Sequence, residues 1–241
     1  MKIIDKIAKK NMDFYHEKPA TIVFFGDSVT HGCFECYFEE NGAINTIFDA
    51  KSGYPTRVNE ILHVLYPSAQ INIINSGISG DNAPNGNARF ERDVLPYNPD
   101  LVVVAFGLND STGGKEQVEK YTTALGEIFD KTKSIGAECI FVAQNMMCTK
   151  ISPHLTDERD KGVAKGISEL ENNGTVEYYF QKAVETAKAR GVQVCDMYSK
   201  WRTMYNHGVN VTELLANKFN HPIREMHYYT AIELIETMFK D

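Results

Sequence analysis

The sequence has no long hydrophobic run: its most apolar stretch, residues 101–108, has the length of a strand and falls well short of a membrane span. It also lacks an excess of basic residues, since 25 Lys and Arg stand against 32 Asp and Glu. A nucleic-acid-binding protein usually presents a basic face, so we expect no nucleic-acid partner. Charged residues interrupt the N-terminus too often for a signal peptide, and we therefore expect a cytoplasmic protein without a membrane partner.

Cysteine is sparse and odd in number, with five residues, so the chain does not carry a disulfide framework. Cys139 and Cys195 fall in predicted strands, where they are most simply small buried hydrophobic residues. Cys33 and Cys36 form a C-x-x-C pair near His31. The chain offers no second C-x-x-C or H-x₃-H pair at the spacing of a zinc site. A metal or redox function is therefore disfavoured, and we expect neither a metal nor an organic cofactor.

Signatures of phosphate-binding loops are absent as well, because the chain contains neither G-x-G-x-x-G nor G-K-[ST]. This absence counts against a flavodoxin-like module that binds a nucleotide, which is the alternative from a different functional class. No internal repeat, low-complexity segment or linker divides the chain, so we predict one domain over residues 1–241. Apolar residues at helical spacing near the N-terminus predict a helix within about residues 1–18 that packs on this domain. The sequence carries no signal for an oligomeric state.

The chain does contain a regular alternation of apolar strands and amphipathic helices. Five apolar, β-branched runs are predicted strands: Thr21–Phe25, Ile71–Ile74, Leu101–Phe106, Cys139–Ala143 and Val192–Cys195. Helices are predicted at about residues 54–65, 86–95, 115–133, 175–190 and 224–240, with two short helices around Lys200 and Glu213. Parallel strands need crossover connections, so this order predicts a three-layer α/β/α fold with a flavodoxin-like, mostly parallel five-stranded sheet.

Two segments do not fit the alternation. Residues 33–52 are aromatic and acidic without clear periodicity, and residues 144–173 are predicted to be a long polar loop. Loops of that length in a compact domain usually serve a function.

Polar residues follow each of the first three predicted strands at the point where the strand ends. Gly26-Asp-Ser28 follows the first, residues 77–81 (Gly-Ile-Ser-Gly-Asp) follow the second, and residues 107–110 (Gly-Leu-Asn-Asp) follow the third. The carboxyl ends of parallel strands meet at one edge of a sheet, so we expect these residues to line one crevice. The local alternative is that the Asp and Ser of the first segment merely cap a helix.

These three segments and a late His-Pro pair resemble the four sequence blocks of the SGNH/GDSL hydrolase family, over roughly residues 20–240. The resemblance implies that Ser28 is the nucleophile and His221 the general base. It also implies that the N–H groups of Ser28 and Gly80 and the side-chain amide of Asn109 form the oxyanion hole. The chemistry agrees with these roles, because a serine hydroxyl needs a base and a tetrahedral intermediate needs donors for its charged oxygen.

One position departs from the family pattern. Lys218 stands three residues before His221, where the family usually has an Asp that orients the imidazole. Either an acid comes from elsewhere, or a backbone carbonyl or Asn217 orients the ring and the site is a Ser–His dyad. We expect the Lys218 side chain to point to solvent, as most lysines do.

The resemblance implies a hydrolase of small acyl esters that forms an acyl-enzyme on Ser28. Our first hypothesis for the substrate is a short-chain acyl group, such as acetate, on a carbohydrate. Phe34, Tyr37, Phe38 and the segment 144–173 are expected to shape the alcohol side of the pocket. The alternatives are a lipase or thioesterase for longer acyl chains, and an inactive relative that binds carbohydrate, which only the missing acid supports.

The other polar candidates are assigned structural roles. His31 is expected to be solvated or to cap a helix, and His154 and His227 have no identifiable partner in the sequence. Asp27 and Asp110 are expected to hold their loops by accepting backbone N–H groups.

Overall fold

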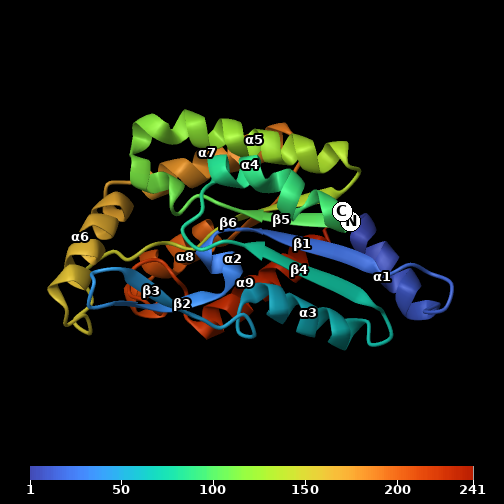
Figure 1. The fold of residues 1–241 in the computed structure, drawn as a ribbon, viewed down its shortest axis with the longest axis horizontal. Coiled ribbons are helices and arrows are strands. Elements are labelled where there is room, and N and C mark those ends of the chain that lie inside the picture. Colours follow the sequence, from blue (N-terminus) through green and yellow to red (C-terminus); the bar gives the residue numbers. More distant parts are fainter. Residues whose placement is uncertain (241) are drawn as a thin grey trace.

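A parallel β-sheet forms the centre of the protein in the computed structural model, which describes residues 1–240 (Figure 1). Within this range the sheet has five strands in the order β4-β1-β5-β6-β7. Each neighbouring pair is parallel. The strands are β1 (Ala20–Gly26), β4 (Ile71–Gly77), β5 (Leu101–Ala105), β6 (Glu138–Ala143) and β7 (Gln193–Asp196). The predicted α/β class with a five-stranded sheet is confirmed.

Helices cover both faces of the sheet, with α4, α5 and α7 on one side and α3 and α9 on the other (Figure 1). The helices are α1 (Lys2–Met12), α2 (Ser28–His31), α3 (Tyr54–Leu65), α4 (Ala83–Asp93), α5 (Val118–Ser134), α6 (Glu158–Asn172), α7 (Thr175–Ala189), α8 (Met197–Asn206) and α9 (Arg224–Met238). Short 3₁₀ helices occupy Leu95–Tyr97, Asp110–Gly113, Lys115–Gln117 and Val211–Leu214. In the described residues, 1–240, no helix is both long and apolar enough to cross a bilayer.

The N-terminal helix α1 lies near the edge where the sheet strands begin. It buries Ile3 and Ile7, and the backbone N–H of Ile3 donates to the Glu138 carboxylate at the start of β6 (2.8 Å). The helix ends at Met12, so it is shorter than the segment 1–18 to which the sequence assigned it.

The segment 33–52 is not irregular, as the sequence analysis expected, but contains an antiparallel hairpin of β2 (Cys33–Phe38) and β3 (Ile44–Phe48). Neither strand has one fully buried and one fully exposed face. The alternation of apolar and polar residues that identifies a half-buried strand is therefore missing from its sequence.

The segment 144–173 is not a continuous loop, because α6 occupies its second half. The helix is hard to detect in the sequence because its buried positions are Ala164, Ser168 and Glu171, which are small or polar. The Glu171 carboxylate accepts the backbone N–H of Met147 (2.9 Å) and the hydroxyl of Tyr198 (2.6 Å). A buried acid thus fixes the residues that follow β6.

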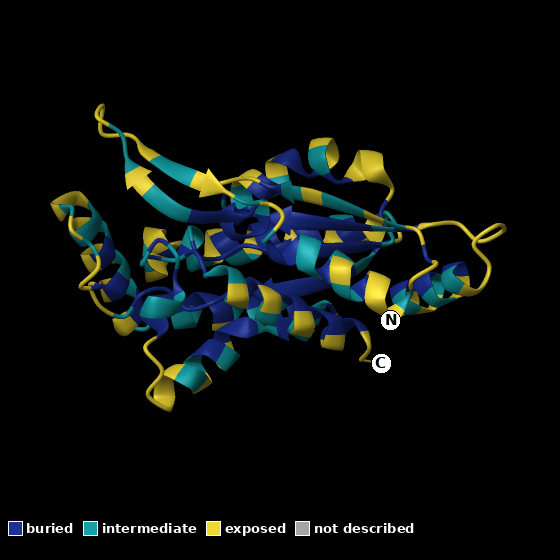
Figure 2. Cartoon of the chain, turned by 90° about the horizontal axis from the view of Figure 1, so that it is seen from below, coloured by how far each residue is buried: buried dark blue, intermediate teal, exposed yellow. Residues whose placement is uncertain are grey.

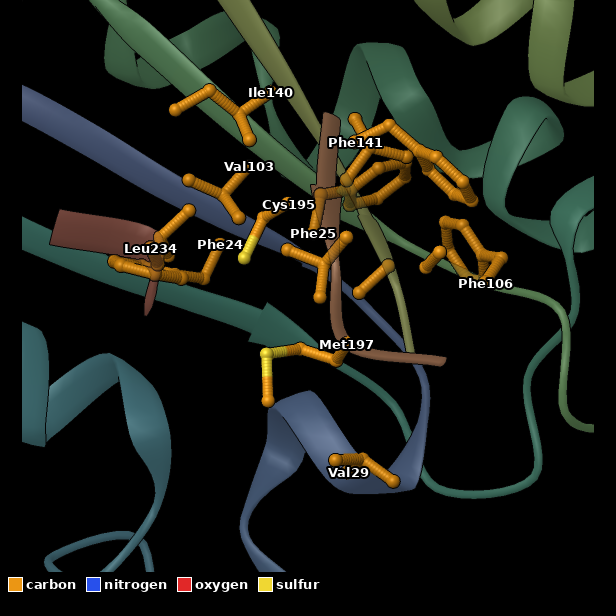
Figure 3. Packing of buried hydrophobic residues seen from close by; sticks show 14 of the residues in the cluster. Phe24, Phe25, Val29, Val103, Phe106, Ile140, Phe141, Cys195, Met197 and Leu234 are labelled. Carbon is orange, nitrogen blue, oxygen red and sulfur yellow. The ribbon is translucent and has the colours of Figure 1, made fainter. Parts of the chain in front are cut away.

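The core consists of apolar side chains from both faces of the central strands (Figure 3). Phe25 makes edge-to-face contacts with Phe90 of α4 and Phe106, at centroid distances of 5.9 and 5.4 Å. Phe24 contacts Tyr54 of α3 in the same manner at 5.6 Å. Because both faces are covered, β1, β5 and β6 are buried along nearly their whole length, as Figure 2 shows in dark blue, whereas the edge strands β4 and β7 are only partly buried.

Glycines at the strand ends let the short helix α2 pack directly on the sheet. A Cβ placed on Gly77, at the end of β4, would lie 2.3 Å from the backbone nitrogen of His31. A Cβ on Gly26 would lie 2.2 Å from the Thr30 hydroxyl oxygen. Any other residue at either position would push α2, and with it Ser28, away from the sheet.

We predict that Gly77→Ala lowers the free energy of unfolding by about 1–3 kcal/mol, because the added methyl group meets backbone atoms that cannot yield by rotating a side chain. Gly162→Ala is the matched control. Gly162 is exposed within α6 and has open space around it, so alanine should raise stability by about 0.5–1 kcal/mol through its higher helix propensity. Urea unfolding measures both changes, and equal stabilities for Gly77→Ala and the wild type would contradict the close packing of α2.

Candidate active site

Ser28 and His221 meet at the carboxyl end of β1. Ser28 begins α2, and Asp27 caps that helix by accepting the backbone N–H of Val29. The Ser28 Oγ lies 2.9 Å from the His221 Nε2, although 193 positions separate the two residues in the chain. Both are buried, with exposed fractions of 4% and 5%. A hydroxyl hydrogen-bonded to a ring nitrogen can transfer its proton as the oxygen attacks an electrophile.

A backbone carbonyl orients the imidazole. The His221 Nδ1 lies 2.9 Å from the carbonyl oxygen of Phe34. A carbonyl can only accept, so Nδ1 carries the hydrogen and Nε2 is free to take the Ser28 proton. Within residues 1–240 no hydrogen bond or ion pair joins this ring to a carboxylate. Of the arrangements that the sequence left open, the structure has the carbonyl-oriented one.

Asn217 supports the main chain of this segment rather than the ring. Its Oδ1 accepts the backbone N–H groups of Phe219, Asn220 and His221, each at 3.0 Å. Burial lowers the pKa of His221 below its ordinary value, and the Phe34 carbonyl partly opposes this shift. The imidazole is therefore neutral near pH 7, which is the form that can act as a base.

Lys218 does not face the imidazole. Its backbone adopts the left-handed conformation with φ +62°, and its Nζ lies 3.0 Å from a carboxylate oxygen of Glu213. The side chain is 20% exposed, so the expectation of a solvent-facing lysine is only partly met. The ion pair with Glu213 directs the charge away from the ring.

A bulge in the hairpin makes the Phe34 carbonyl available. The ladder pairs Cys33 with Phe48 and Cys36 with Thr46, so β2 has one residue more than β3 between these pairs. Such a bulge leaves backbone groups outside the ladder and bends the strand. The carbonyl that accepts the imidazole N–H comes from this bulge, which was not predicted because the sequence here has no clear periodicity.

Arg224 holds the bulge against the histidine. Its guanidinium donates to Glu35 (2.7 Å) and to Asp49 (2.9 Å) and lies 4.3 Å from the centre of the Phe34 ring. Arg224 begins α9, three residues after His221. Arg224, close to the candidate base in the chain, therefore anchors the hairpin whose carbonyl orients that base.

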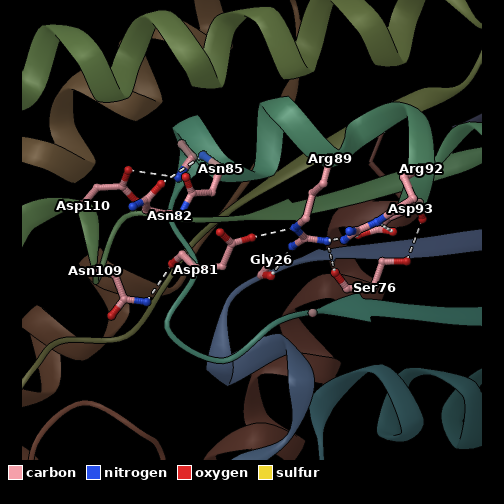
Figure 4. A network of polar contacts seen from close by, with 12 residues as sticks. Gly26, Ser76, Asp81, Asn82, Asn85, Arg89, Arg92, Asp93, Asn109 and Asp110 are labelled. Carbon is pink, nitrogen blue, oxygen red and sulfur yellow. Dashed lines mark hydrogen bonds and ion pairs between the residues drawn. The ribbon is translucent and has the colours of Figure 1, made fainter.

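The second and third loops lie beside the first because β4 and β5 are the two neighbours of β1. Gly80 is exposed and has φ +79°, a conformation that favours glycine. The Asn109 amide donates to the carbonyl oxygen of Asp81 at 2.7 Å and so joins the two loops (Figure 4). A primary amide has two N–H groups, so one remains for a ligand.

Arg89 of α4 ties these loops to the sheet, a role that was not predicted from the sequence. The buried guanidinium pairs with Asp81 (2.6 Å) and donates to the carbonyl oxygens of Gly26 (2.9 Å) and Ser76 (2.8 Å) (Figure 4). Its place on the inward face of α4, beside Gly86 and Phe90, was the available signal. An arginine on a buried helix face needs several partners, which here are the ends of two strands.

Two carboxyl groups, of the buried Asp27 and the partly buried Asp110, hold the loops by accepting backbone N–H groups, as expected. Asp27 accepts the Val29 N–H (3.0 Å) and both of its oxygens accept from the Gln144 amide (2.9 and 3.0 Å). Asp110 accepts the backbone N–H of Ala83 at 3.0 Å. Burial raises the pKa of each of these carboxyl groups to about 7.

The other histidines have structural surroundings. His31 packs against Phe48, with ring centroids 4.8 Å apart, and His154 is exposed and lies 3.7 Å from Glu213. His227 is buried, and its Nδ1 accepts the backbone N–H of Tyr54 at 3.1 Å. Burial lowers the pKa of His227 to about 3, so this ring is a neutral core residue.

No group of three metal-ligating side chains occurs in the part of the chain that the structure describes, residues 1–240. Cys33 is buried, and burial raises the pKa of its thiol to about 11.

The aromatic residues expected at the pocket differ in their positions. The Phe34 ring is fully buried against His227, so it cannot line a substrate pocket. Tyr37 is 47% exposed on the hairpin. The Phe38 ring lies 4.5 Å from the Arg159 guanidinium, which brings the hairpin into contact with α6.

Comparison with known proteins identifies a family and related sequences. The family model described as "GDSL-like Lipase/Acylhydrolase family" matches residues 24–228. An acetylxylan esterase of Geobacillus stearothermophilus is 35% identical over 89 residues, which are 37% of this chain and 39% of that protein. An arylesterase of Vibrio mimicus is 28% identical over 109 residues, 43% of this chain and 52% of that protein. The matched segments thus span about half or less of the length of these curated relatives.

A solved structure has the same fold along nearly the whole chain. It is an acetylxylan esterase from Geobacillus stearothermophilus, with a TM-score of 0.67 and 20% sequence identity, and the match covers 92% of this chain and 95% of that one.

We predict that Asp27→Asn stabilises the protein above about pH 7 and changes little near pH 4. The folded pKa of about 7 lies above the ordinary 3.8, so the stability linked to protonated Asp27 is complete below about pH 4 and is lost as pH rises through about 7. Asn does not titrate, and its amide can donate to the Gln144 Oε1, which has no partner.

Urea unfolding at two pH values tests this prediction, with Asp5→Asn on the exposed surface of α1 as the control. An Asp27→Asn variant that loses as much stability as the wild type between the two pH values would contradict it.

Proposed function

The chain belongs to the GDSL-like lipase/acylhydrolase family, and on this premise we propose that it is a serine hydrolase that cleaves carboxylic esters through an acyl-enzyme on Ser28. The observation that carries the proposal is the 2.9 Å contact between the Ser28 Oγ and the His221 Nε2. The ring is held by Phe34 in the tautomer that accepts a proton at this nitrogen.

The first half of the reaction is an acyl transfer to Ser28. As Oγ attacks the ester carbon, its proton moves to the His221 Nε2, and the carbonyl oxygen becomes an oxyanion. The N–H groups of Ser28 and Gly80 and the free N–H of Asn109 are the proposed donors to that oxygen. One such donor typically contributes about 100- to 1000-fold in turnover. The intermediate collapses when His221 returns the proton to the leaving alcohol.

Water completes the cycle by the same route. His221 takes a proton from water, the resulting oxygen attacks the acyl carbon, and the proton returns to the Ser28 Oγ as the acid leaves. In this dyad a carbonyl dipole, rather than a carboxylate, faces the imidazolium that forms in each half-reaction. The dipole fixes the tautomer but supplies less electrostatic stabilisation than a full negative charge.

For the substrate, we propose a short acyl group, such as acetyl, on a carbohydrate. The pocket that includes Asn109 has a volume of about 220 Å³, and polar side chains line much of it, including Asn82, Thr112, Gln117 and Lys120. Such a lining suits a hydroxyl-rich alcohol better than a long acyl chain. Similarity to acetylxylan esterases supports the same choice.

We predict that the protein releases acetate from acetylated xylo-oligosaccharides and hydrolyses acetyl esters faster than octanoyl esters of the same alcohol. Ser28→Ala should lower the rate by at least about 1000-fold while leaving the thermal midpoint nearly unchanged, since the hydroxyl is not part of the apolar core. A fluorophosphonate probe should label the wild type and not the variant.

Each result separates the alternatives. A preference for octanoyl esters would indicate a lipase or thioesterase, whereas carbohydrate binding without hydrolysis or labelling would indicate an inactive relative. Activity of Ser28→Ala within about tenfold of the wild type would exclude Ser28 as the nucleophile.

We further predict that kcat/KM rises with pH through a single ionisation whose midpoint lies below 6.5, the ordinary pKa of histidine. The sign follows from the burial of His221, which disfavours the imidazolium, and only the neutral ring can accept the serine proton. His221→Ala should remove this ionisation together with most of the rate. A midpoint above 6.5, or the same profile in His221→Ala, would show that another group is the base.

A further inference from the structure

A second group of the hairpin lies beside the Nδ1 of His221. The Cys36 Sγ is 3.8 Å from this nitrogen and is only partly buried. The same sulfur is 3.5 Å from the hydroxyl of Thr46 and 3.6 Å from the side-chain amide of Asn217. Cys36 follows the bulge residue Phe34 by two positions, so the two acceptors come from one strand.

The hydrogen bonds of this cluster determine how the sulfur faces the ring. The single hydrogen on the His221 Nδ1 is directed at the Phe34 carbonyl, so the sulfur can interact with the ring only through a lone pair. The Asn217 amide donates to the same sulfur. The Thr46 hydroxyl lies at hydrogen-bond distance from the sulfur on another side, and either group can donate in that contact. The electron-rich side of the sulfur therefore faces the imidazole.

We propose that Cys36 is a positioning residue for His221, and that its sulfur and the Phe34 carbonyl together occupy the place where a catalytic triad has its carboxylate. The proposal rests on the proposed roles of Ser28 and His221. When the Ser28 proton reaches Nε2, the ring becomes a cation, and a polarisable sulfur at 3.8 Å from Nδ1 stabilises that charge. The sulfur also limits rotation of the His221 ring away from its hydrogen bond to the Phe34 carbonyl.

The surroundings of Cys36 distinguish this role from simple packing. Buried cysteines in this chain, such as Cys139 of β6 and Cys195 of β7, belong to the apolar core that covers the sheet. Cys36 instead contacts an imidazole, a hydroxyl and an amide, all through its sulfur. Its contact with the imidazole of the candidate base is what sets it apart from the cysteines of the core.

The test compares three substitutions at one position by steady-state kinetics on an acetyl ester over a range of pH. Cys36→Ala removes the acceptor and should lower kcat about 3- to 30-fold with little change in KM, because the imidazolium exists only in the transition state. Cys36→Ser keeps an acceptor and should recover part of this loss. Cys139→Ala, a buried thiol of β6 with no contact to the site, is the control and should keep the wild-type profile.

Cys36→Asp tests the pH midpoint of kcat/KM, which would not change if Cys36 only packed against its neighbours. A carboxylate beside Nδ1 favours the charged ring, so the pH midpoint of kcat/KM should shift upward by about one unit or more. Circular dichroism and the thermal midpoint show whether this variant folds. If it does not, the loss of kcat in Cys36→Ala and its recovery in Cys36→Ser decide the question.

The outcomes for this inference and for the proposed function are distinct. Unchanged kcat in Cys36→Ala together with an unmoved pH midpoint in a folded Cys36→Asp would overturn the inference, while the loss of activity in Ser28→Ala would still support the function. Hydrolysis that survives Ser28→Ala would overturn both.

Discussion

The candidate site depends on the hydrogen bond between the His221 ring and the carbonyl oxygen of Phe34. This bond selects the tautomer in which Nε2 faces Ser28, and without it the imidazole could rotate or carry its hydrogen on the wrong nitrogen. The bond exists because β2 has a bulge at this point and because Arg224 clamps the bulge to the start of α9. A hairpin outside the main sheet thus takes the part that an acidic side chain has in a triad.

The opposite side of the site depends on buried polar groups. They fix the positions of the loops, but their burial lowers the stability of the folded protein. Arg89 and Asp81 form a buried ion pair, and the carboxyl groups of Asp27 and Asp110 lie beneath the same loops. Burying such groups is costly unless each has several partners, and here the partners are backbone groups at strand ends. The loops are therefore held by directional bonds, which define positions more sharply than apolar packing does.

Residues near one another in the sequence were easier to predict than contacts between distant ones. The apolar runs and the polar segments that end them were enough for the sheet, and the family resemblance of those segments supplied the candidates Ser28, Gly80 and Asn109. The β2–β3 hairpin and α6 were missed because their buried positions are few and often polar. Arg89 was missed for a similar reason, since one charged residue on a helix face reveals nothing of the strand ends that it contacts.

By itself, the sequence determined the α/β class, the strands and the edge of the sheet at which the polar loops gather, because periodicity and strand-end residues are local properties. The sequence also left open which group orients His221, because Lys218 stands where the expected acid would be. Only the tertiary structure decided what orients His221. The acceptor is a backbone carbonyl 187 positions away, and since every residue has such a carbonyl, residue types do not reveal which one is used. The same holds for Cys36, whose sulfur meets the imidazole only because the bulge and the Arg224 clamp bring the hairpin to it.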